Sequence, residues 1–428
     1  MHSLLFVFFI AAVLLTIDAY LLHGLRAALA NWAIIRKKGF NIFYWIFCAG
    51  MVFGLLCCVY FKLGVGVRAA FLMFFFVTQV AKLCFLPFMI IDDVRRYIIK
   101  KRKTKEAAKL KAEDKKEETE PIQITRSSFL MKAGIMATSV PVIGLGAGVV
   151  SRVGVFDYQL KRVNLYLPNL PKKFDGLTLG QISDIHSGSY HKRDRIRIRG
   201  GVDMLMKEKP DMIFFTGDLV NDVATDIEWV YDCFTPIKAP LGVFSCFGNH
   251  DYGDYSQLTG KPRQENRDAM IKLHHSYGWD LLLNENRRLK VEGEEIGIVG
   301  IENWGVLSRF PKYGRMDLAT KNTGDLPVKL LLSHDPSHWR AEVLPKYPQI
   351  DAVFAGHTHG MQFGVQTGYF QWSPIEYLYE EWAGLYREAH QQIYVNVGFG
   401  YVGYPGRIGI LPEITIFTLR SGTDPSLT

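Results

Sequence analysis

Five polar clusters in the second half of the chain hold residue types that bind metal ions. Each follows a short apolar run, and in order they read Asp184-Ile185-His186, Gly217-Asp218, Gly248-Asn249-His250-Asp251, Ser333-His334 and Gly356-His357-Thr358-His359. Imidazole, carboxylate and amide oxygen together suit divalent Zn, Mn or Fe rather than Ca or Mg alone. The candidate ligands are Asp184, His186, Asp218, Asn249, His334, His357 and His359.

Seven ligands are too many for one ion that also keeps open positions, so the pattern predicts two ions that share a carboxylate. Two metals about 3.5–4 Å apart form a clamp for in-line displacement at phosphorus and lower the pKa of a water between them. Taken singly, each cluster also fits a turn whose polar side chains satisfy nearby backbone groups. Five clusters that each follow a strand-like run favour the metal site.

The apolar runs before the clusters predict the elements that position them. They are Leu177–Ile182, Met212–Phe215, Gly242–Phe247, Val328–Leu332 and Ala352–Ala355. Runs of this length read as buried strands, and helix-like segments lie between them. Open α/β sheets build their sites at the carboxyl ends of such strands.

The order of the five motifs is similar to that of the calcineurin-like metallophosphoesterase superfamily, over about residues 160–420. The tail resembles the membrane-associated bacterial branch of that superfamily in three further segments, Glu381–Arg387, Tyr394–Gly398 and Pro412–Thr415. After the last histidine pair that branch usually has Gly-Gly-Gln, whereas this chain has Gly360-Met361-Gln362.

The resemblance implies a two-sheet α/β sandwich flanked by helices, with two divalent transition metal ions. Asp184, His186 and His359 would hold one ion and Asp218 would bridge to the other. Asn249, His334 and His357 would complete the second ion, and a metal-bridging hydroxide would attack phosphorus. The function implied is hydrolysis of a phosphoester or pyrophosphate bond.

Two further residues are candidates for the catalytic steps. His250 matches the histidine of the superfamily that is not a ligand and that stabilises or protonates the leaving oxygen. Asp251 would orient His250, or else make a local turn contact. Arg387 and Arg407 are candidates for holding the substrate phosphate, and Glu302 for facing the site, although an ordinary structural position is commoner for each.

The positive charge of the chain lies in its front part. The chain has 428 residues and a net charge of +8, but residues 1–152 hold 21 Lys and Arg against 9 Asp and Glu. The remainder is mildly acidic, so the basic composition predicts no nucleic-acid partner. Six Cys in this length also exclude a disulfide scaffold.

The front part contains apolar runs long enough to cross a bilayer. We expect a three-span transmembrane domain over residues 1–93, a basic charged linker over 94–124 and a fourth span over 125–152. The phosphoesterase domain would then occupy 153–428. The fourth segment begins with a degenerate twin-arginine export motif, in which Ser127 follows Arg126 where a second Arg belongs.

Basic residues at the ends of the spans predict the orientation, because Lys and Arg near span ends stay in the cytoplasm. Four lie between the first two spans and eleven follow the third, between Arg95 and Lys116. The C-terminal domain is therefore expected outside the cytoplasmic membrane, where a lipid-linked phosphorylated substrate is one option. The alternative is a non-catalytic metal-binding or sensory module on a membrane anchor.

Overall fold

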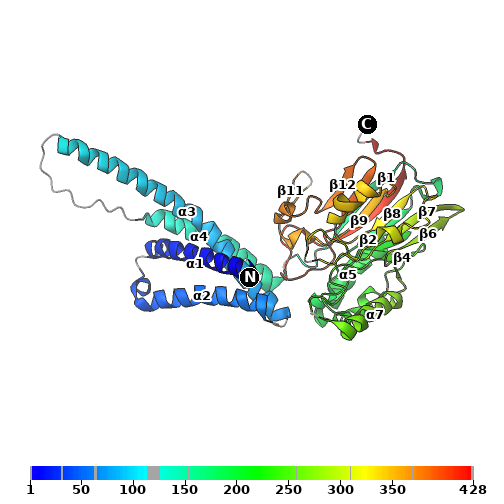
Figure 1. Ribbon diagram of the computed structural model, residues 1–428, viewed down its shortest axis with the longest axis horizontal. Coiled ribbons are helices and arrows are strands. Elements are labelled where there is room, and N and C mark those ends of the chain that lie inside the picture. The colour runs from blue at the N-terminus through cyan, green and yellow to red at the C-terminus, as the bar shows by residue number, and fades with distance from the viewer. Residues whose placement is uncertain are drawn as a thin grey trace. The chain divides into compact units, whose positions relative to one another are not determined.

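The computed structural model describes residues 2–29, 32–61, 65–112, 126–152, 154–256, 258–308, 310–367 and 370–425. The chain forms two compact units, Met1–Val150 and Ser151–Thr428. The first is helical and the second is built around β-sheets (Figure 1). Residues 113–125, which belong to the predicted linker and to the start of the predicted fourth span, lie outside the described residues.

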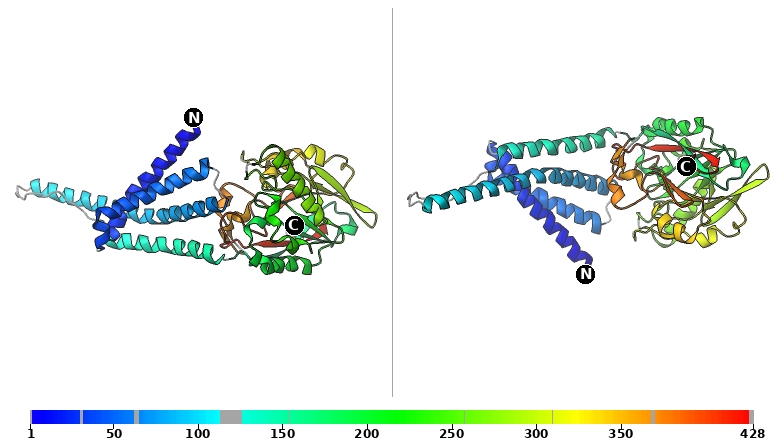
Figure 2. Two further views of the ribbon diagram at one scale, coloured as in Figure 1. Left: turned by 90° about the horizontal axis from the view of Figure 1, so that it is seen from below. Right: turned by 90° about the horizontal axis from the view of Figure 1, so that it is seen from above.

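The helical unit contains long apolar helices (Figure 2). They are α1 (His2–Ala28), α2 (Lys38–Tyr60), α3 (Val65–Ala112) and α4 (Ser128–Ser151), with the short helix η1 (Ala33–Arg36) before α2. Within the described residues, three segments are long and apolar enough to cross a bilayer: Phe9–Ala28, Lys38–Cys58 and Phe74–Lys105. These identify a membrane protein, while a fourth span, at the position of α4, stays a prediction.

Helix α3 continues into the segment that we expected to be a linker. It runs unbroken from Val65 to Ala112, so residues 94–112 are helical. The physical reason is composition, because this stretch is rich in Lys, Arg and Ala, which are strong helix formers. The predicted domain boundary at residue 93 therefore lies within α3, where its sequence changes from apolar to charged.

Two ionisable residues inside the apolar helices pair with each other. Asp18 of α1 is 1% exposed, and its Oδ1 lies 2.7 Å from Nζ of Lys82 in α3. A charge in an apolar span is costly unless it finds such a partner. The pair therefore neutralises both groups and joins α1 to α3.

The export-like segment is bound within the helical unit. Nη1 of Arg126 lies 3.1 Å from Oδ1 of Asp93, and the backbone N–H of Ser127 donates to Oδ1 of Asp92 at 3.0 Å. The Ser127 hydroxyl oxygen also accepts from the backbone N–H of Leu130, as an N-cap does. These contacts tie the start of α4 to α3.

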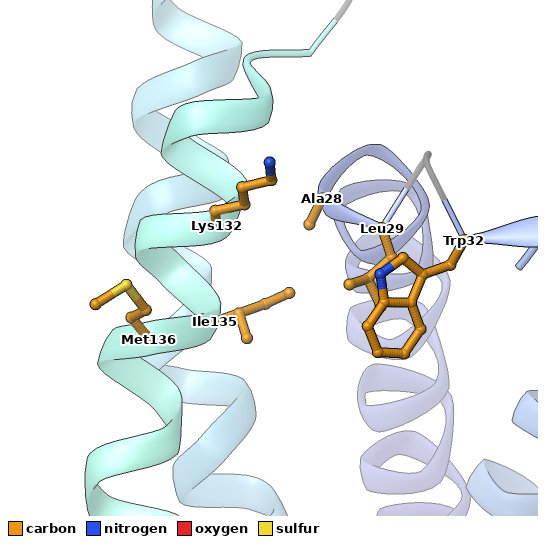
Figure 3. A pocket seen from close by; sticks show the side chains of 6 residues that line it. All are labelled: Ala28, Leu29, Trp32, Lys132, Ile135 and Met136. Carbon is orange, nitrogen blue, oxygen red and sulfur yellow. The ribbon is translucent and has the colours of Figure 1, made fainter.

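A pocket of about 240 Å³ lies in the helical unit, between the end of α1 and helix α4 (Figure 3). Its lining contains one cation and no carboxylate or imidazole: Ala28, Leu29, Trp32, Lys132, Ile135 and Met136. This pocket therefore offers no set of metal ligands.

The C-terminal unit contains two six-stranded sheets (Figure 1). In the first, the spatial order is β1 (Gln159–Leu167), β14 (Glu413–Ser421), β2 (Thr178–Ile182), β3 (Met212–Phe215), β4 (Val243–Ser245) and β5 (Asp280–Leu281). In the second, it is β12 (Gly384–Glu388), β13 (Gln391–Val395), β9 (Ala352–Ala355), β8 (Lys329–Leu332), β7 (Glu294–Gly300) and β6 (Glu285–Val291). A separate hairpin consists of β10 (Val365–Gln366) and β11 (Gln371–Trp372).

The two sheets pack face to face over an apolar core. Phe214 of β3 and Phe354 of β9 meet edge to face there, with ring centroids 5.0 Å apart. The neighbouring residues Ile213 and Phe215 point to the opposite face of the first sheet, because side chains alternate along a strand. This alternation explains why the strands read as continuous apolar runs, since both faces are buried.

Helices cover the outer faces of both sheets. The first sheet packs against α5 (Arg195–Lys207), α6 (Tyr231–Phe234) and α7 (Gly260–Ser276), and the second against α8 (Met316–Ala319) and the turn Trp339–Lys346. The predicted fold, a two-sheet α/β sandwich flanked by helices and preceded by a helical membrane domain, is confirmed.

Candidate metal centre

The carboxyl ends of the central strands bring the predicted ligands together. Strands β2, β3 and β4 are parallel in the first sheet, and β8 and β9 are parallel in the second. The ligand atoms fall into three groups within which they lie no more than 4.8 Å apart: Asp184 with His186 and His359, His186 with Asp218 and His250, and Asp218 with His334 and His357.

The first group joins the loop after β2 to the loop after β9. Nε2 of His186 lies 3.0 Å from Nε2 of His359, and Nε2 of His359 lies 3.2 Å from Oδ1 of Asp184. All three side chains are buried. An imidazole pair facing a carboxylate at these distances can hold one divalent ion.

The third group, Asp218 with His334 and His357, contains a histidine whose orientation is fixed by the backbone. Nδ1 of His334 lies 2.7 Å from the carbonyl oxygen of Thr216, to which it donates, so Nε2 is the ring nitrogen left to face an ion. Nε2 is buried without a hydrogen-bond partner and lies 3.1 Å from Oδ2 of Asp218. A buried imidazole nitrogen left in this way fits a metal ligand.

Asp218 lies between the imidazole of His186, which belongs to the first group, and that of His334, which belongs to the third. Its Oδ2 is 3.1 Å from Nε2 of His334 and 3.5 Å from Nε2 of His186. Asn249 offers a further ligand, because its Nδ2 donates to the hydroxyl of Tyr255 at 2.8 Å while its Oδ1 is buried and unpaired. The donor set therefore fits two ions that share the Asp218 carboxylate.

The backbone at these residues is strained in a common way. Five predicted ligands have a positive φ, which is uncommon for residues with a side chain: Asp184, His186, Asp218, His357 and His359. Such strain persists only where the surrounding structure holds it, and it clusters at functional sites. At position 356 the space, and not the backbone angle, requires glycine, because a Cβ there would collide with Oγ of Ser183 and Oδ2 of Asp184.

Burial keeps most of the imidazoles neutral. It lowers the pKa of three of them below the usual range: His186, His357 and His359. Neutral imidazole is the form that binds a metal ion. At His334 burial is the largest effect and acts in the same direction, but the charges of Asp218 and Asp184 and the hydrogen bonds to Asp218 and Thr216 together outweigh it and raise the pKa to about 10. A metal ion at His334 would therefore displace a proton.

The carboxylates are held in the charged form. Burial alone raises the pKa of Asp184 and Asp218, but the neighbouring histidines outweigh it and lower both values. His359 has the largest such effect on Asp184, and His334 on Asp218. Both carboxylates are thus in the charge state that a divalent ion requires.

His250 is positioned by a carbonyl group and a stacked ring. Its Nδ1 lies 2.5 Å from the carbonyl oxygen of Asn221, and its ring stacks on Tyr255 with centroids 4.1 Å apart. The Asp251 carboxylate instead accepts backbone N–H bonds from Gly248, Asp218 and Leu219 at 2.8–2.9 Å. Asp251 thus bonds to the backbone of its own turn and of the loop after β3, whereas the group that contacts Nδ1 of His250 is the Asn221 carbonyl.

Two side chains near His357 were not singled out from the sequence. The hydroxyl of Tyr379 lies 2.9 Å from Nε2 of His357, and Oδ2 of Asp335 lies 3.6 Å from the same atom. These partners leave Nδ1 of His357 to face an ion. Asp335 directly follows His334, so the motif could have indicated it. Nothing in the sequence around Tyr379 indicates its contact with His357.

The two arginine candidates make other contacts than the one expected with a substrate phosphate. Arg407 is fully buried, and its guanidinium donates to the carbonyl oxygens of Gly400 and Val397 at 2.8 Å. It lies 3.1 Å from Nδ1 of His359, so it packs behind a ligand and cannot receive a substrate phosphate. Arg387 pairs with Asp424.

Glu302 is held away from the metal groups by two other contacts. Its carboxylate accepts from Arg267 at 3.0 Å and from Asn284 at 2.9 Å. Its position after β7 had suggested that it faces the site, but both of its oxygens are used in this network.

Two family models match the chain. Residues 177–361 match the model described as calcineurin-like phosphoesterase, and residues 2–153 match the model described as probable calcineurin-like phosphoesterase, transmembrane domain. The chain belongs to the calcineurin-like phosphoesterases. This confirms the resemblance on which the site was predicted, and the C-terminal unit is a metallophosphoesterase domain, of a class that uses divalent metals.

Several curated relatives of this calcineurin-like phosphoesterase carry related names. A transmembrane protein with metallophosphoesterase domain from Danio rerio is 31% identical over 268 residues, which cover 60% of this chain and 56% of that protein. The uncharacterized metallophosphoesterase YkuE of Bacillus subtilis (strain 168) is 29% identical, with coverage of 59% and 82%. The chain thus spans little more than half the length of the Danio rerio relative.

A third relative is named for its substrate. It is the UDP-2,3-diacylglucosamine pyrophosphatase LpxG of Chlamydia trachomatis, which is 28% identical over 247 residues that cover 48% of this chain and 71% of that protein.

Proposed function

We propose that the C-terminal unit hydrolyses a phosphoester or pyrophosphate bond with two divalent ions of manganese, zinc or iron. The observation that carries the proposal is the position of Asp218, whose carboxylate lies within 3.5 Å of an imidazole from each of two ligand groups. Asp184, His186 and His359 would hold one ion. Asn249, His334 and His357 would hold the other, and Asp218 would contribute to both.

Such a pair of ions lowers the pKa of an attacking water and absorbs the negative charge that develops on the phosphoryl oxygens. The side chains of the protein supply the remaining steps. His250 donates from Nδ1 to the Asn221 carbonyl, and in its doubly protonated form the ring would give its Nε2 proton to the departing oxygen and return to the neutral state. Asp251 ties the loop after β4 to the loop after β3, and so supports the positions of Asn249 and Asp218.

We further propose that the domain lies on the extracytoplasmic side of the cytoplasmic membrane and acts on a lipid-linked substrate. The basic residues around the predicted spans support this side, provided that α4 is the fourth span. The lipid-linked substrate is supported by the membrane anchor and by the name of the Chlamydia trachomatis relative, which specifies a substrate with two acyl groups.

The test of the activity uses the full chain in detergent or nanodiscs. Bound metals are counted by mass spectrometry, and hydrolysis is measured with chromogenic phosphomonoester and phosphodiester substrates. Asp218→Ala should lose metal and activity, while the exposed control Asp203→Ala on α5 should keep both. Full activity of Asp218→Ala would contradict the proposed site, and a metal-loaded wild type without hydrolysis would favour the binding-module alternative.

The side of the membrane is tested separately. A reporter fused at the C-terminus, active only outside the cytoplasm, should be active in intact cells. Signal from a cytoplasm-specific reporter at the same position would overturn the proposed orientation.

A further inference from the structure

The segment after the last metal histidine exposes a group of large apolar side chains, which we call the apolar rim. Their exposed fractions are 48% for Met361, 44% for Val365, 60% for Phe370, 76% for Tyr377 and 59% for Leu378. They lie on η7 (His359–Gln362), on the β10–β11 hairpin and on or directly after η8 (Pro374–Tyr377) (Figure 1). Exposed apolar groups of this size mark contact with a membrane or a partner.

The apolar rim is the outer side of a lobe that has its own core. Ile375, Tyr379 and Trp382 are buried in an apolar cluster together with Val397 and Ile410. The segment from Val365 to Trp382 thus contains inward residues that belong to this cluster and outward residues that are exposed. The exposed residues are therefore available to a contact outside the fold.

The rim lies directly beside the metal centre. Met361 follows the ligand His359 by two residues, and Tyr379, one residue after Leu378, bonds to His357 at 2.9 Å. Whatever surface covers the rim is therefore brought close to the proposed ligands.

The rim also lies near the point where the chain enters the C-terminal unit from α4. Helix α4 ends at Ser151, and Gly154 packs so closely on the Arg407 carbonyl that a Cβ would collide with it. The next residue along, Ile408, accepts from the backbone N–H of Gly364 at 2.9 Å. Gly364 precedes Val365 of the rim. The contacts of Gly154 with Arg407 and of Ile408 with Gly364 therefore connect the segment after α4 to the rim.

A basic turn flanks the same entry point. Arg152, the residue after α4, bonds to Asp194 at 2.7 Å, and Lys192, Arg193 and Arg197 lie next to Asp194 in sequence. Within the part of the chain that the structure describes, these three cations make no ion pair with a carboxylate. Two of them lie over aromatic rings, Lys192 over Trp229 and Arg197 over Phe156, and cations beside a membrane attract anionic headgroups.

We propose that the apolar rim inserts into the interfacial layer of the lipid bilayer, with the basic turn on anionic headgroups, and so holds the metal centre at the membrane surface. Aromatic and aliphatic side chains next to cations are the composition of interfacial membrane contacts. Attachment through α4, proposed above as the fourth span, favours lipid over a soluble partner as the occupant. This inference rests on the proposed anchoring through α4 and is independent of whether the site hydrolyses its substrate.

The test uses photocrosslinking in the full chain, reconstituted in nanodiscs of phosphatidylethanolamine and phosphatidylglycerol. Tyr377 is replaced by p-benzoylphenylalanine, with Phe370 as a second insertion point should the first variant fold poorly. The control position is Leu318 on α8, which is also exposed but lies outside the rim. After irradiation, mass spectrometry should find lipid adducts at 377 and 370 and several-fold fewer at 318.

Lipid adducts at the rim no more frequent than at 318 would overturn the proposal. So would adducts formed mainly with a second copy or with the helices of the same chain. Adducts form whether or not a substrate is cleaved, so a failure of the proposed activity does not change this result, and hydrolysis of a soluble chromogenic ester is scored separately.

Discussion

The Nε2 atom of His334 and the Oδ2 atom of Asp218 lie 3.1 Å apart, although they come from different sheets of the sandwich. His334 follows β8 of the second sheet, and Asp218 follows β3 of the first. The Thr216 carbonyl, also after β3, holds the other nitrogen of the same ring. The proposed second ion would thus join the two sheets at their carboxyl edges.

Removing this imidazole tests the ligand set. His334→Ala should reduce the bound metal from two ions to one and lower hydrolysis by more than about 100-fold, because the remaining ion lacks its partner for the phosphoryl charge. Metal counting and steady-state kinetics measure both effects. His390→Ala, at an exposed histidine, is the control, and two retained ions in His334→Ala would exclude this residue as a ligand.

The hydroxyl of Tyr379 should matter through His357. Tyr379→Phe removes the 2.9 Å bond that orients the ring, and loss of such an outer partner costs about 10–100-fold in metal affinity. Competition with a chelator measures the affinity. Tyr377→Phe, two residues earlier but exposed, should leave it unchanged, and equal affinities for both variants would contradict the orienting role.

The close approach at Gly356 should not tolerate a methyl group. Gly356→Ala places Cβ against Ser183 and Asp184, and overpacking of this kind costs about 1–3 kcal/mol. A lower unfolding midpoint together with weaker metal binding is expected. Gly200→Ala on α5 meets no atom within 4 Å and should be neutral or slightly stabilising. Wild-type metal affinity in Gly356→Ala would refute the steric argument.

His274 should make the C-terminal unit sensitive to acid. Burial lowers the pKa of His274 to about 3, while the unfolded chain has a value near 6.5. The unfolded state therefore binds more protons below pH 6.5, and stability falls as the pH decreases from 6.5 towards 3. From pH 6.5 to pH 5 the loss is about 2 kcal/mol.

Thermal unfolding of the full chain at several pH values checks this dependence. His274→Gln keeps a polar partner for the Ser245 hydroxyl, which lies 2.9 Å from Nδ1 of His274, but it cannot take up a proton. Its unfolding midpoint should vary less between pH 6.5 and pH 5 than that of the wild type. An unchanged slope would show that other groups dominate the acid response.

The strands and the ligand clusters were accessible from the sequence because their signals are local. An apolar run such as Met212–Phe215 followed by Gly217-Asp218 specifies both a buried strand and a polar end. Parallel pairing then brings such ends to one edge. The membrane helices were likewise evident from length and composition.

The contacts between segments distant in sequence could not be predicted from the sequence. The nitrogen of His334 that faces Asp218 depends on a carbonyl 118 residues away, and the burial of Arg407 depends on the loop around Gly400. Arg407 and Asp251 are charged residues in motif-rich segments, and nothing in their neighbours indicates that both serve the backbone. Assigning these structural roles requires the three-dimensional structure.

The position of β14 in the first sheet has a consequence for the order of events during synthesis. This strand, Glu413–Ser421, pairs with β1 on one side and with β2 on the other, although more than 200 residues separate it from both in the chain. A ribosome therefore makes all five metal motifs before β14, which lies between β1 and β2, exists. The loop that holds Asp184 and His186 gains the support of β14 only when translation has passed Ser421, so we expect metal loading to follow synthesis of β14.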